Sequence, residues 1–139
     1  MIKSVIHVGI VVEDVEKMIG FYRDTLGMKF LTEDNNEPGK ILKGLKIEQR
    51  AVFLDAGNTV IELLDYRPFT EARGKVRTRE TPGLTHIALE VDDIHKTVKE
   101  LKTKGVAFDV DPLDCGSCTV AFFSDPEGNI IEFYAEKQG

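Results

Sequence analysis

The sequence lacks several features that would place it in a membrane, outside the cell or on nucleic acid. No apolar run approaches the ~20 residues that a membrane-spanning helix needs, and the opening MIKSVIHVG has no apolar core of a signal peptide. Positive charge is not in excess either, because the net charge is −6 and the pI is about 5.1. These absences predict a cytoplasmic protein that binds neither membranes nor nucleic acid.

Cysteine is scarce, with only Cys115 and Cys118 in 139 residues. They form a C-x-x-C pair, a pattern that can be redox-active or bind metal in a reducing compartment. A thioredoxin-like pair opens a helix, whereas this pair precedes an apolar strand, and a zinc site would need a second ligand pair. We therefore interpret the pair as loop residues, with a redox role as the alternative. A chain of this length needs no disulfide to fold.

The main feature of the sequence is an internal repeat. The segment IHVGIVVEDV at 6–15 matches THIALEVDDI at 85–94 at an offset of 79. In both copies the histidine is followed by Val five residues later, by Asp seven residues later and by a branched apolar residue eight residues later. The repeat predicts two modules of the same local structure.

Each copy continues into a helical pattern. An aspartate precedes the pattern as a cap, and a glycine follows it as the residue that ends the helix. These positions are Asp14 and Gly27 in the first copy, and Asp93 and Gly105 in the second. The first helix is therefore expected to be one residue longer than the second.

The two halves also end alike. Phe53 lies nine residues before Glu62, and Phe123 lies nine residues before Glu132, each across a strand–turn–strand pattern. Neither half could bury both its helix and its sheet alone. We predict an α+β fold of two paired βαβββ modules that form a curved mixed sheet around a central metal site. The single domain would comprise module 1 at about 1–64, a linker at 65–82 and module 2 at about 83–139.

Two histidines and two glutamates recur at matching positions of the two halves: His7, Glu62, His86 and Glu132. A lone histidine is more often a core residue and a lone glutamate more often a surface one, but recurrence in register favours a shared role. Carboxylates in apolar strands are costly unless they are paired or metal-bound. Two imidazoles and two carboxylates suit one divalent ion, such as Zn, Ni, Co, Mn or Fe, with positions left for a small-molecule substrate.

These motifs resemble the vicinal-oxygen-chelate superfamily, which comprises glyoxalase, bleomycin-resistance and dioxygenase proteins. HVGIVV at 7–12 and LGM at 26–28 resemble its first module, whereas GLTHIALEVDD at 83–93 and FSDPEGNIIE at 123–132 resemble its second. The resemblance to glyoxalase I implies that the four residues are metal ligands. It also implies a lyase or isomerase that moves a proton next to a carbonyl through a metal-stabilised enediolate, with Glu132 or Glu62 as the base.

The resemblance leaves the substrate open. Val11 stands where bacterial glutathione-using enzymes carry an arginine, so the thiol is not assigned. PGLTH at 82–86 also resembles methylmalonyl-CoA epimerase, whose usual second ligand is Gln rather than Glu62. Ring-cleaving dioxygenases use two histidines and one carboxylate, and antibiotic-binding relatives generally lack the ligands. These three classes are the alternatives.

Two further predictions concern the surroundings of the site. The linker is basic, and we identify Arg67, Arg77 and Arg79 as candidates to hold a carboxylate or phosphate of the substrate, with a solvated linker as the alternative. We also expect a homodimer. Its modules would pair either within one chain or by exchange with the partner.

Overall fold

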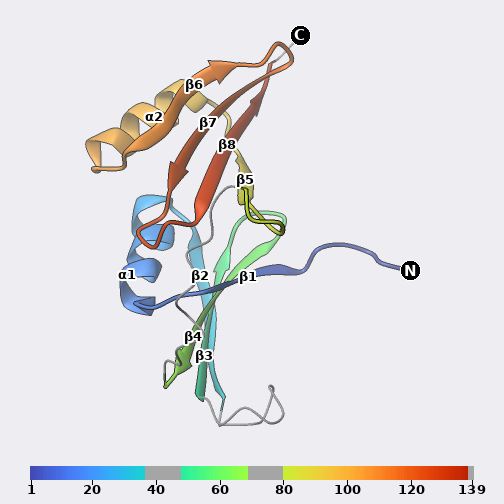
Figure 1. The fold of residues 1–139 in the computed structure, drawn as a ribbon, viewed down its shortest axis with the longest axis vertical. Coiled ribbons are helices and arrows are strands. Elements are labelled where there is room, and N and C mark those ends of the chain that lie inside the picture. The colour runs from blue at the N-terminus through green and yellow to red at the C-terminus, as the bar shows by residue number, and fades with distance from the viewer. Residues whose placement is uncertain (37–47, 69–79, 138–139) are drawn as a thin grey trace. The chain divides into compact units, whose positions relative to one another are not determined.

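The computed structural model describes residues 1–36, 48–68 and 80–137 and divides the chain into two compact units, Met1–Val76 and Arg77–Gly139 (Figure 1). The first unit contains β1 (His7–Val11), α1 (Val15–Ile19), the π-helical segment η1 (Gly20–Thr25), β2 (Lys29–Asn36), β3 (Glu48–Asp55) and β4 (Val60–Arg67). The second contains β5 (His86–Glu90), α2 (Ile94–Thr103), β6 (Phe108–Asp114), β7 (Cys118–Ser124) and β8 (Ile130–Glu136).

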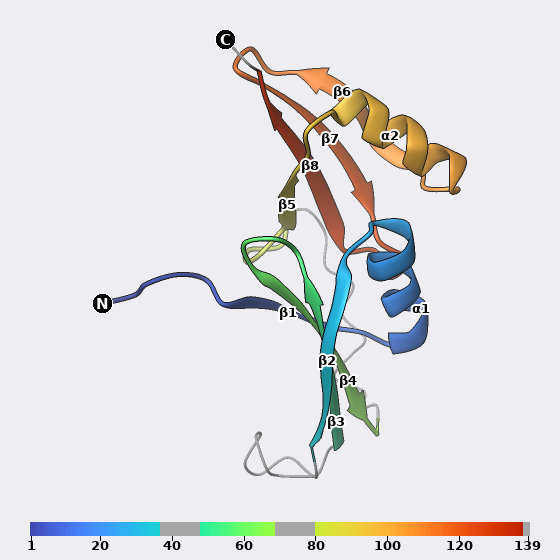
Figure 2. The same ribbon diagram turned by 180° about the vertical axis from the view of Figure 1, so that it is seen from behind.

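Each unit holds a four-stranded mixed sheet, and the two sheets have the same topology. The strand orders are β1-β4-β3-β2 and β5-β8-β7-β6. In both sheets the first strand runs parallel to the last, and the other neighbours are antiparallel. Figures 1 and 2 show the helix of each unit beside its own sheet. The predicted α+β fold of two βαβββ modules is confirmed.

The caps predicted from the repeat are present in both helices. The backbone N–H of Lys17 donates to Asp14 at 3.0 Å, and that of Lys96 donates to Asp93 at 2.9 Å. The apolar stripe of α2, formed by Ile94, Val98 and Leu101, is buried. Each helix is therefore oriented by a capped start and one apolar face.

The first helix differs from the second in its last turn and a half, which is π-helical. The N–H of Leu26 donates to the carbonyl of Phe21 at 3.0 Å, a bond that spans five residues instead of four. Both helices end at a glycine with positive φ, 81° at Gly27 and 88° at Gly105. The wider turn accommodates the extra residue of the first copy, so both modules keep equivalent helix ends.

The hairpins of the two units differ by one residue in register. Phe53 pairs with Glu62 in β4, but it is Phe122, not Phe123, that pairs with Glu132 in β8. The reason is loop length, because Asp55 pairs with Val60 whereas Ser124 pairs with Ile130. Neighbouring strand residues face opposite ways, so Phe53 lies on the same face as Glu62 while Phe123 is fully buried in the core. The sequence match of Phe53 with Phe123 does not hold in space.

The hydrophobic core of each unit lies between the helix and the sheet. In the first unit it is formed by residues of α1 and by the inward residues of the two central strands, among them Met18, Val52, Leu54, Ile61 and Leu63. In the second unit Phe108, Phe123 and Phe133 pack together, with ring centroids 4.8–6.2 Å apart. None of the described helices is long and apolar enough to cross a membrane.

Candidate metal-binding site

In the first unit, strand pairing sets His7 beside Glu62. His7 lies opposite Val60 and Gly9 lies opposite Glu62 in the parallel pair β1–β4. Because strand side chains alternate, His7 and Glu62 share one face of the sheet, away from the core. Nε2 of His7 lies 3.2 Å from Oε2 of Glu62, and the Glu62 side chain is only 13% exposed.

The second unit repeats this arrangement. His86 lies opposite Ile130 and Ala88 lies opposite Glu132 in the parallel pair β5–β8. Nε2 of His86 lies 2.9 Å from Oε2 of Glu132, whose side chain is 14% exposed. We call the sheet face that carries the His–Glu pair the ligand face of each unit.

A small residue lies directly opposite each glutamate. A Cβ at Gly9 would approach Oε2 of Glu62 to 3.4 Å and the Leu64 side chain to 3.3 Å. In the second unit the same position is Ala88. These residues leave room for the carboxylate to turn towards the histidine. Their spacing, two residues after each histidine, is a signal in the repeat that the sequence analysis did not use.

Thr85 is a further residue that the sequence analysis missed. Its Oγ1 lies 2.8 Å from Nδ1 of His86. In the tautomer with the proton on Nδ1, Nδ1–H donates a hydrogen bond to the Thr85 hydroxyl and Nε2 is left with a lone pair for a metal. This is the usual role of an outer partner of a ligand histidine. The residue before His7 is Ile6, so the first unit has no equivalent hydroxyl. The alternation of strand side chains did not predict this contact. Thr85 directly precedes His86, and adjacent residues of a strand are expected to face opposite ways.

Aromatic residues border both pairs on the ligand face. The Phe122 ring meets the His86 ring edge-on, with centroids 5.9 Å apart. Phe53 holds the matching place opposite Glu62. Tyr66, four residues after Glu62 in β4, lies on the same face. Burial and the negative charge of Glu62 raise the pKa of its phenol. The surroundings of each pair are thus apolar on the side of the antiparallel hairpin.

The spacing within each pair suits two neighbouring ligands of one metal ion. Donors bound at about 2.1 Å on adjacent octahedral positions lie about 3 Å apart, and the observed distances are 3.2 and 2.9 Å. One imidazole and one carboxylate per unit form the donor set expected for a borderline divalent ion. In the described ranges no group of three or more His, Cys, Asp or Glu side chains is arranged around a metal position. A four-ligand centre therefore needs the pairs of two units, from one chain or from two.

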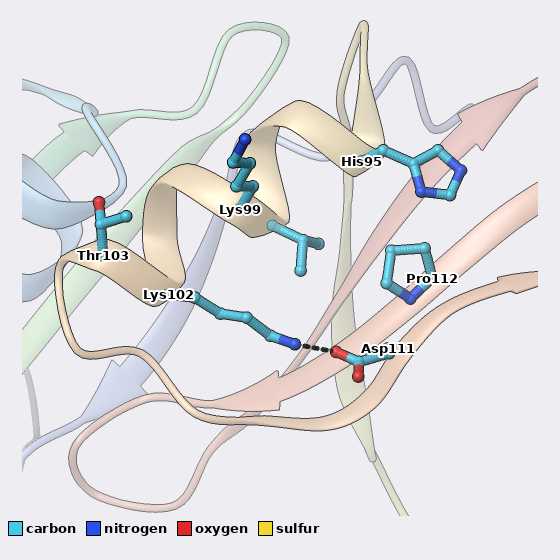
Figure 3. A pocket seen from close by; sticks show the side chains of 7 residues that line it. His95, Lys99, Lys102, Thr103, Asp111 and Pro112 are labelled. Carbon is cyan, nitrogen blue, oxygen red and sulfur yellow. Dashed lines mark hydrogen bonds and ion pairs between the residues drawn. The ribbon is translucent and has the colours of Figure 1, made fainter.

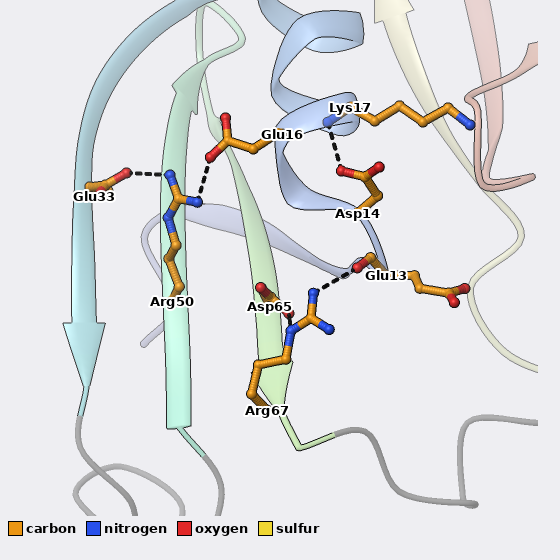
Figure 4. Close-up of polar contacts among 8 residues, drawn as sticks. All are labelled: Glu13, Asp14, Glu16, Lys17, Glu33, Arg50, Asp65 and Arg67. Carbon is orange, nitrogen blue, oxygen red and sulfur yellow. Dashed lines mark hydrogen bonds and ion pairs between the residues drawn. The ribbon is translucent and has the colours of Figure 1, made fainter.

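Arg67, predicted as a substrate-binding residue, is placed on the other face of its sheet. Arg67 directly follows Tyr66 in β4, so the two side chains point to opposite faces. The Arg67 Nε lies 2.9 Å from Asp65 Oδ1. Its Nη2 donates to the carbonyl of Glu13 at 3.1 Å, so the guanidinium ties β4 to the start of α1 (Figure 4). This placement gives Arg67 a structural role beside the helix and does not bring it to Glu62. Arg77 and Arg79 lie outside the described residues.

A separate pocket of about 630 Å³ lies between α2 and β6 (Figure 3). Lys99, Lys102 and Asp111 line it, and the ammonium of Lys102 contacts the Asp111 carboxylate at 2.5 Å. His95, the third histidine, also lines it and is exposed. None of the four predicted ligands borders this pocket.

Comparison with known proteins shows the family. Residues 4–133 match the Glyoxalase/Bleomycin resistance protein/Dioxygenase superfamily. The chain is 32% identical to a lactoylglutathione lyase of Haemophilus influenzae, over 96% of this chain and 93% of that protein. Among solved structures, a glyoxalase family protein of Bacillus cereus aligns with a TM-score of 0.84 at 21% identity, covering 99% and 97% of the two chains. The glyoxalase I of Leishmania major aligns with a TM-score of 0.72 at 28% identity, covering 96% and 87%. This chain is therefore a member of the glyoxalase/bleomycin resistance protein/dioxygenase superfamily.

Proposed function

We propose that this protein is a metal-dependent lyase or isomerase of glyoxalase type, which moves a proton at a carbon next to a carbonyl. The observation that carries the proposal is the duplicated His–Glu pair, with Nε2–Oε2 distances of 3.2 and 2.9 Å at matching positions of the two sheets. The relative from Haemophilus influenzae, 32% identical over almost its whole length, is a lactoylglutathione lyase.

His7, Glu62, His86 and Glu132 are the residues that would hold the metal. A divalent ion in this site would supply a Lewis acid that stabilises the negative charge developing on the substrate oxygens. The two histidines offer imidazole nitrogen donors, and the contact of Thr85 with Nδ1 orients the ring of His86. The family resemblance and the donor chemistry support this assignment together.

The proton-transfer step falls to a glutamate. Glu132 and Glu62 are both candidates, because each carboxylate has one oxygen directed at its histidine and a second oxygen that can accept a proton from carbon. We favour Glu132, whose strand is the more apolar and whose neighbour Phe122 lies against His86. These apolar neighbours limit the access of water to the carboxylate that would accept the proton.

The thiol of the substrate is the open part of this function. Val11, at the position of the arginine found in bacterial glutathione-using enzymes, is half exposed at the end of β1 and bears no charge. A substrate whose thiol lacks a carboxylate at this point fits such a surface better than glutathione does. The glyoxalase I of Leishmania major is trypanothione-dependent, so enzymes of this superfamily also use thiols other than glutathione.

The test is solvent-deuterium incorporation on metal-loaded protein. Methylglyoxal is supplied with glutathione, trypanothione and simple uncharged thiols in turn, and methylmalonyl-CoA is supplied separately. Turnover of a hemithioacetal with deuterium in the product supports the glyoxalase reaction. Exchange only at the methylmalonyl carbon would replace it with an epimerase, and oxygen consumption with a catechol would replace proton transfer with ring cleavage.

A further inference from the structure

Cys115 and Cys118 flank the tightest turn of the second unit. Asp114 pairs with Thr119, and the N–H of Cys115 donates to the carbonyl of Cys118 at 2.9 Å, so the two cysteines face each other across a two-residue turn. Gly116, the first residue of that turn, has a φ of 94°, as type II′ hairpin turns require. Both cysteines are free thiols.

The two cysteines occupy directly opposed positions of this hairpin. The Cys115 thiol donates to the carbonyl of Leu113, with a sulfur–oxygen distance of 3.8 Å. Directly opposed residues of an antiparallel pair have Cα atoms about 4.5–5.5 Å apart, within the range of about 4.4–6.8 Å that a disulfide spans. The Cα spacing of such a pair is therefore compatible with a disulfide.

Three polar contacts hold the turn between the cysteines in place. The N–H of Gly116 donates to the Asp114 carboxylate at 2.7 Å, and the Lys137 ammonium contacts the same carboxylate at 2.5 Å. The N–H of Lys137 donates to the carbonyl of Ser117 at 3.0 Å. Such a turn keeps the two cysteines close to each other before any reaction, which favours an intramolecular bond over reaction with a second molecule.

We propose that Cys115 and Cys118 form a reversible intramolecular disulfide and make this hairpin a thiol–disulfide exchange site. The co-reactant is a small-molecule disulfide. The thiolate of Cys115, the more exposed cysteine, attacks one sulfur of that disulfide and releases one thiolate. Cys118 then loses its proton and attacks the Cys115 sulfur, which releases the second thiolate. Two protein thiols are oxidised and one small disulfide is reduced to two thiols.

The surroundings of Cys115 favour a stable disulfide over a reactive thiolate. Desolvation, the neighbouring Cys118 and the negative charges of Asp114 and Glu132 raise the pKa of the Cys115 thiol. Strongly oxidising pairs owe their reactivity to a stabilised thiolate, and this site lacks that stabilisation. The disulfide is therefore expected to form slowly and to persist once formed.

The location gives the reaction a consequence for the ligand face. Cys118 lies opposite Glu136, and Val120 and Phe122 continue the same face down to Glu132. A disulfide at Cys118 would therefore constrain the end of β7 from which this face leads to Glu132. This inference does not depend on the proposed lyase activity, because the disulfide is measured without turnover.

The experiment equilibrates the full-length protein with defined mixtures of reduced and oxidised glutathione. Free thiols are then alkylated under denaturing conditions, and the intact mass is measured. We expect a single transition from two alkyl groups to none, independent of protein concentration and reversed by dithiothreitol. Persistence of both alkyl groups in oxidised glutathione, or a mixed disulfide with glutathione as the stable product, would overturn the proposal.

Two single variants serve as matched controls. Cys115→Ser and Cys118→Ser each remove one partner with the smallest change of shape. Each should accumulate the mixed disulfide with glutathione, because no second thiol is present to resolve it. Circular dichroism checks that both variants are folded. If either variant resists glutathione adducts as the wild type does, the protection in the wild type is not due to an internal disulfide.

Discussion

Two glutamates set within apolar strands are the residues around which the proposed chemistry is built. The Glu62 and Glu132 side chains are 13% and 14% exposed, so most of their hydration is lost. A carboxylate in that position is costly unless a cation or a hydrogen-bond donor offsets the loss. The histidine beside each glutamate offers one such partner, and a metal bound by both would offer a stronger one.

The replacement Glu132→Gln should therefore weaken metal binding. Gln keeps the shape but removes the charge of a proposed direct ligand, so we expect a loss of roughly ten- to a hundred-fold or more in affinity, the range that even outer-shell changes produce. Equilibrium dialysis followed by elemental analysis measures it. Glu90→Gln, on the same face of β5 and opposite Tyr134, is the control and should bind metal as the wild type does. Equal loss in both variants would count against Glu132 as a ligand.

Thr85→Val tests the outer partner of His86. Valine has nearly the shape of threonine but has no hydroxyl to form a hydrogen bond with Nδ1. The imidazole therefore loses the interaction that fixes its orientation. We expect roughly ten-fold weaker metal binding, with recovery in Thr85→Ser. Isothermal titration with Zn²⁺ or Co²⁺ reports the change. If serine fails to restore affinity, the hydroxyl contact is not the cause.

At the scale of elements, the first helix shows how the module absorbs an extra residue. Its π-helical segment, Gly20–Thr25, separates an ordinary α-helical start from the glycine that ends it. The buried side chains Met18 and Tyr22 remain on the core side through this change. The insertion is thus taken up within the helix, and the following strand β2 begins at an equivalent place.

Two glycines of this helix should respond to alanine in opposite directions. Gly20 has helical φ and ψ of −55° and −42°, and a Cβ there would meet nothing closer than 3.8 Å. Gly20→Ala should stabilise the protein by about 0.5–1 kcal/mol. Gly27 has a φ of 81°, so Gly27→Ala should destabilise it by about 1–2 kcal/mol. Urea unfolding of both variants gives the comparison, and the same sign for both would contradict the helix end described here.

Asp114, beside the turn between β6 and β7, is expected to make the stability of the protein depend on pH. A hydrogen bond from Lys137, together with one from the backbone of Gly116, lowers the pKa of Asp114. The contribution of Asp114 to stability is therefore fully present above the ordinary aspartate pKa of about 3.9 and is lost as the pH falls through the lower folded value. Lys137→Met should raise the pKa of Asp114, measured by NMR titration of its carboxyl carbon. Lys102→Met, which breaks the contact with Asp111 instead, should leave it unchanged.

At the scale of the whole molecule, both units expose large apolar side chains. Val11 is 50% exposed, Leu84 is 84% exposed and Leu113 is 54% exposed. Exposed apolar surface of this kind favours association, in line with the homodimer expected from the sequence. Light scattering at micromolar concentration should then give about 31 kDa, twice the 15.5 kDa of one chain. A mass of one chain would contradict the dimer, and the proposed four-ligand centre would then need both His–Glu pairs from the same chain.

The sequence by itself determined the repeat and the local elements built on it. The caps at Asp14 and Asp93 and the helix-ending glycines depend on neighbours only a few residues away, so their signals are complete within the local sequence. The pairing of each histidine with its glutamate could also be predicted. Each histidine lies in the first strand of its half and each glutamate at the matching position of the last strand, so the contact made in one unit is expected in the other.

Only the tertiary structure decided which neighbours complete the ligand faces. A one-residue difference in loop length places Phe53 and Phe122, rather than Phe53 and Phe123, beside the glutamates. Arg67 falls on the opposite face from Glu62 and binds Asp65 and the carbonyl of Glu13. The physical reason is the same in both cases. Pairing between distant strands sets the register, and a shift of one residue moves a side chain from one face of a sheet to the other.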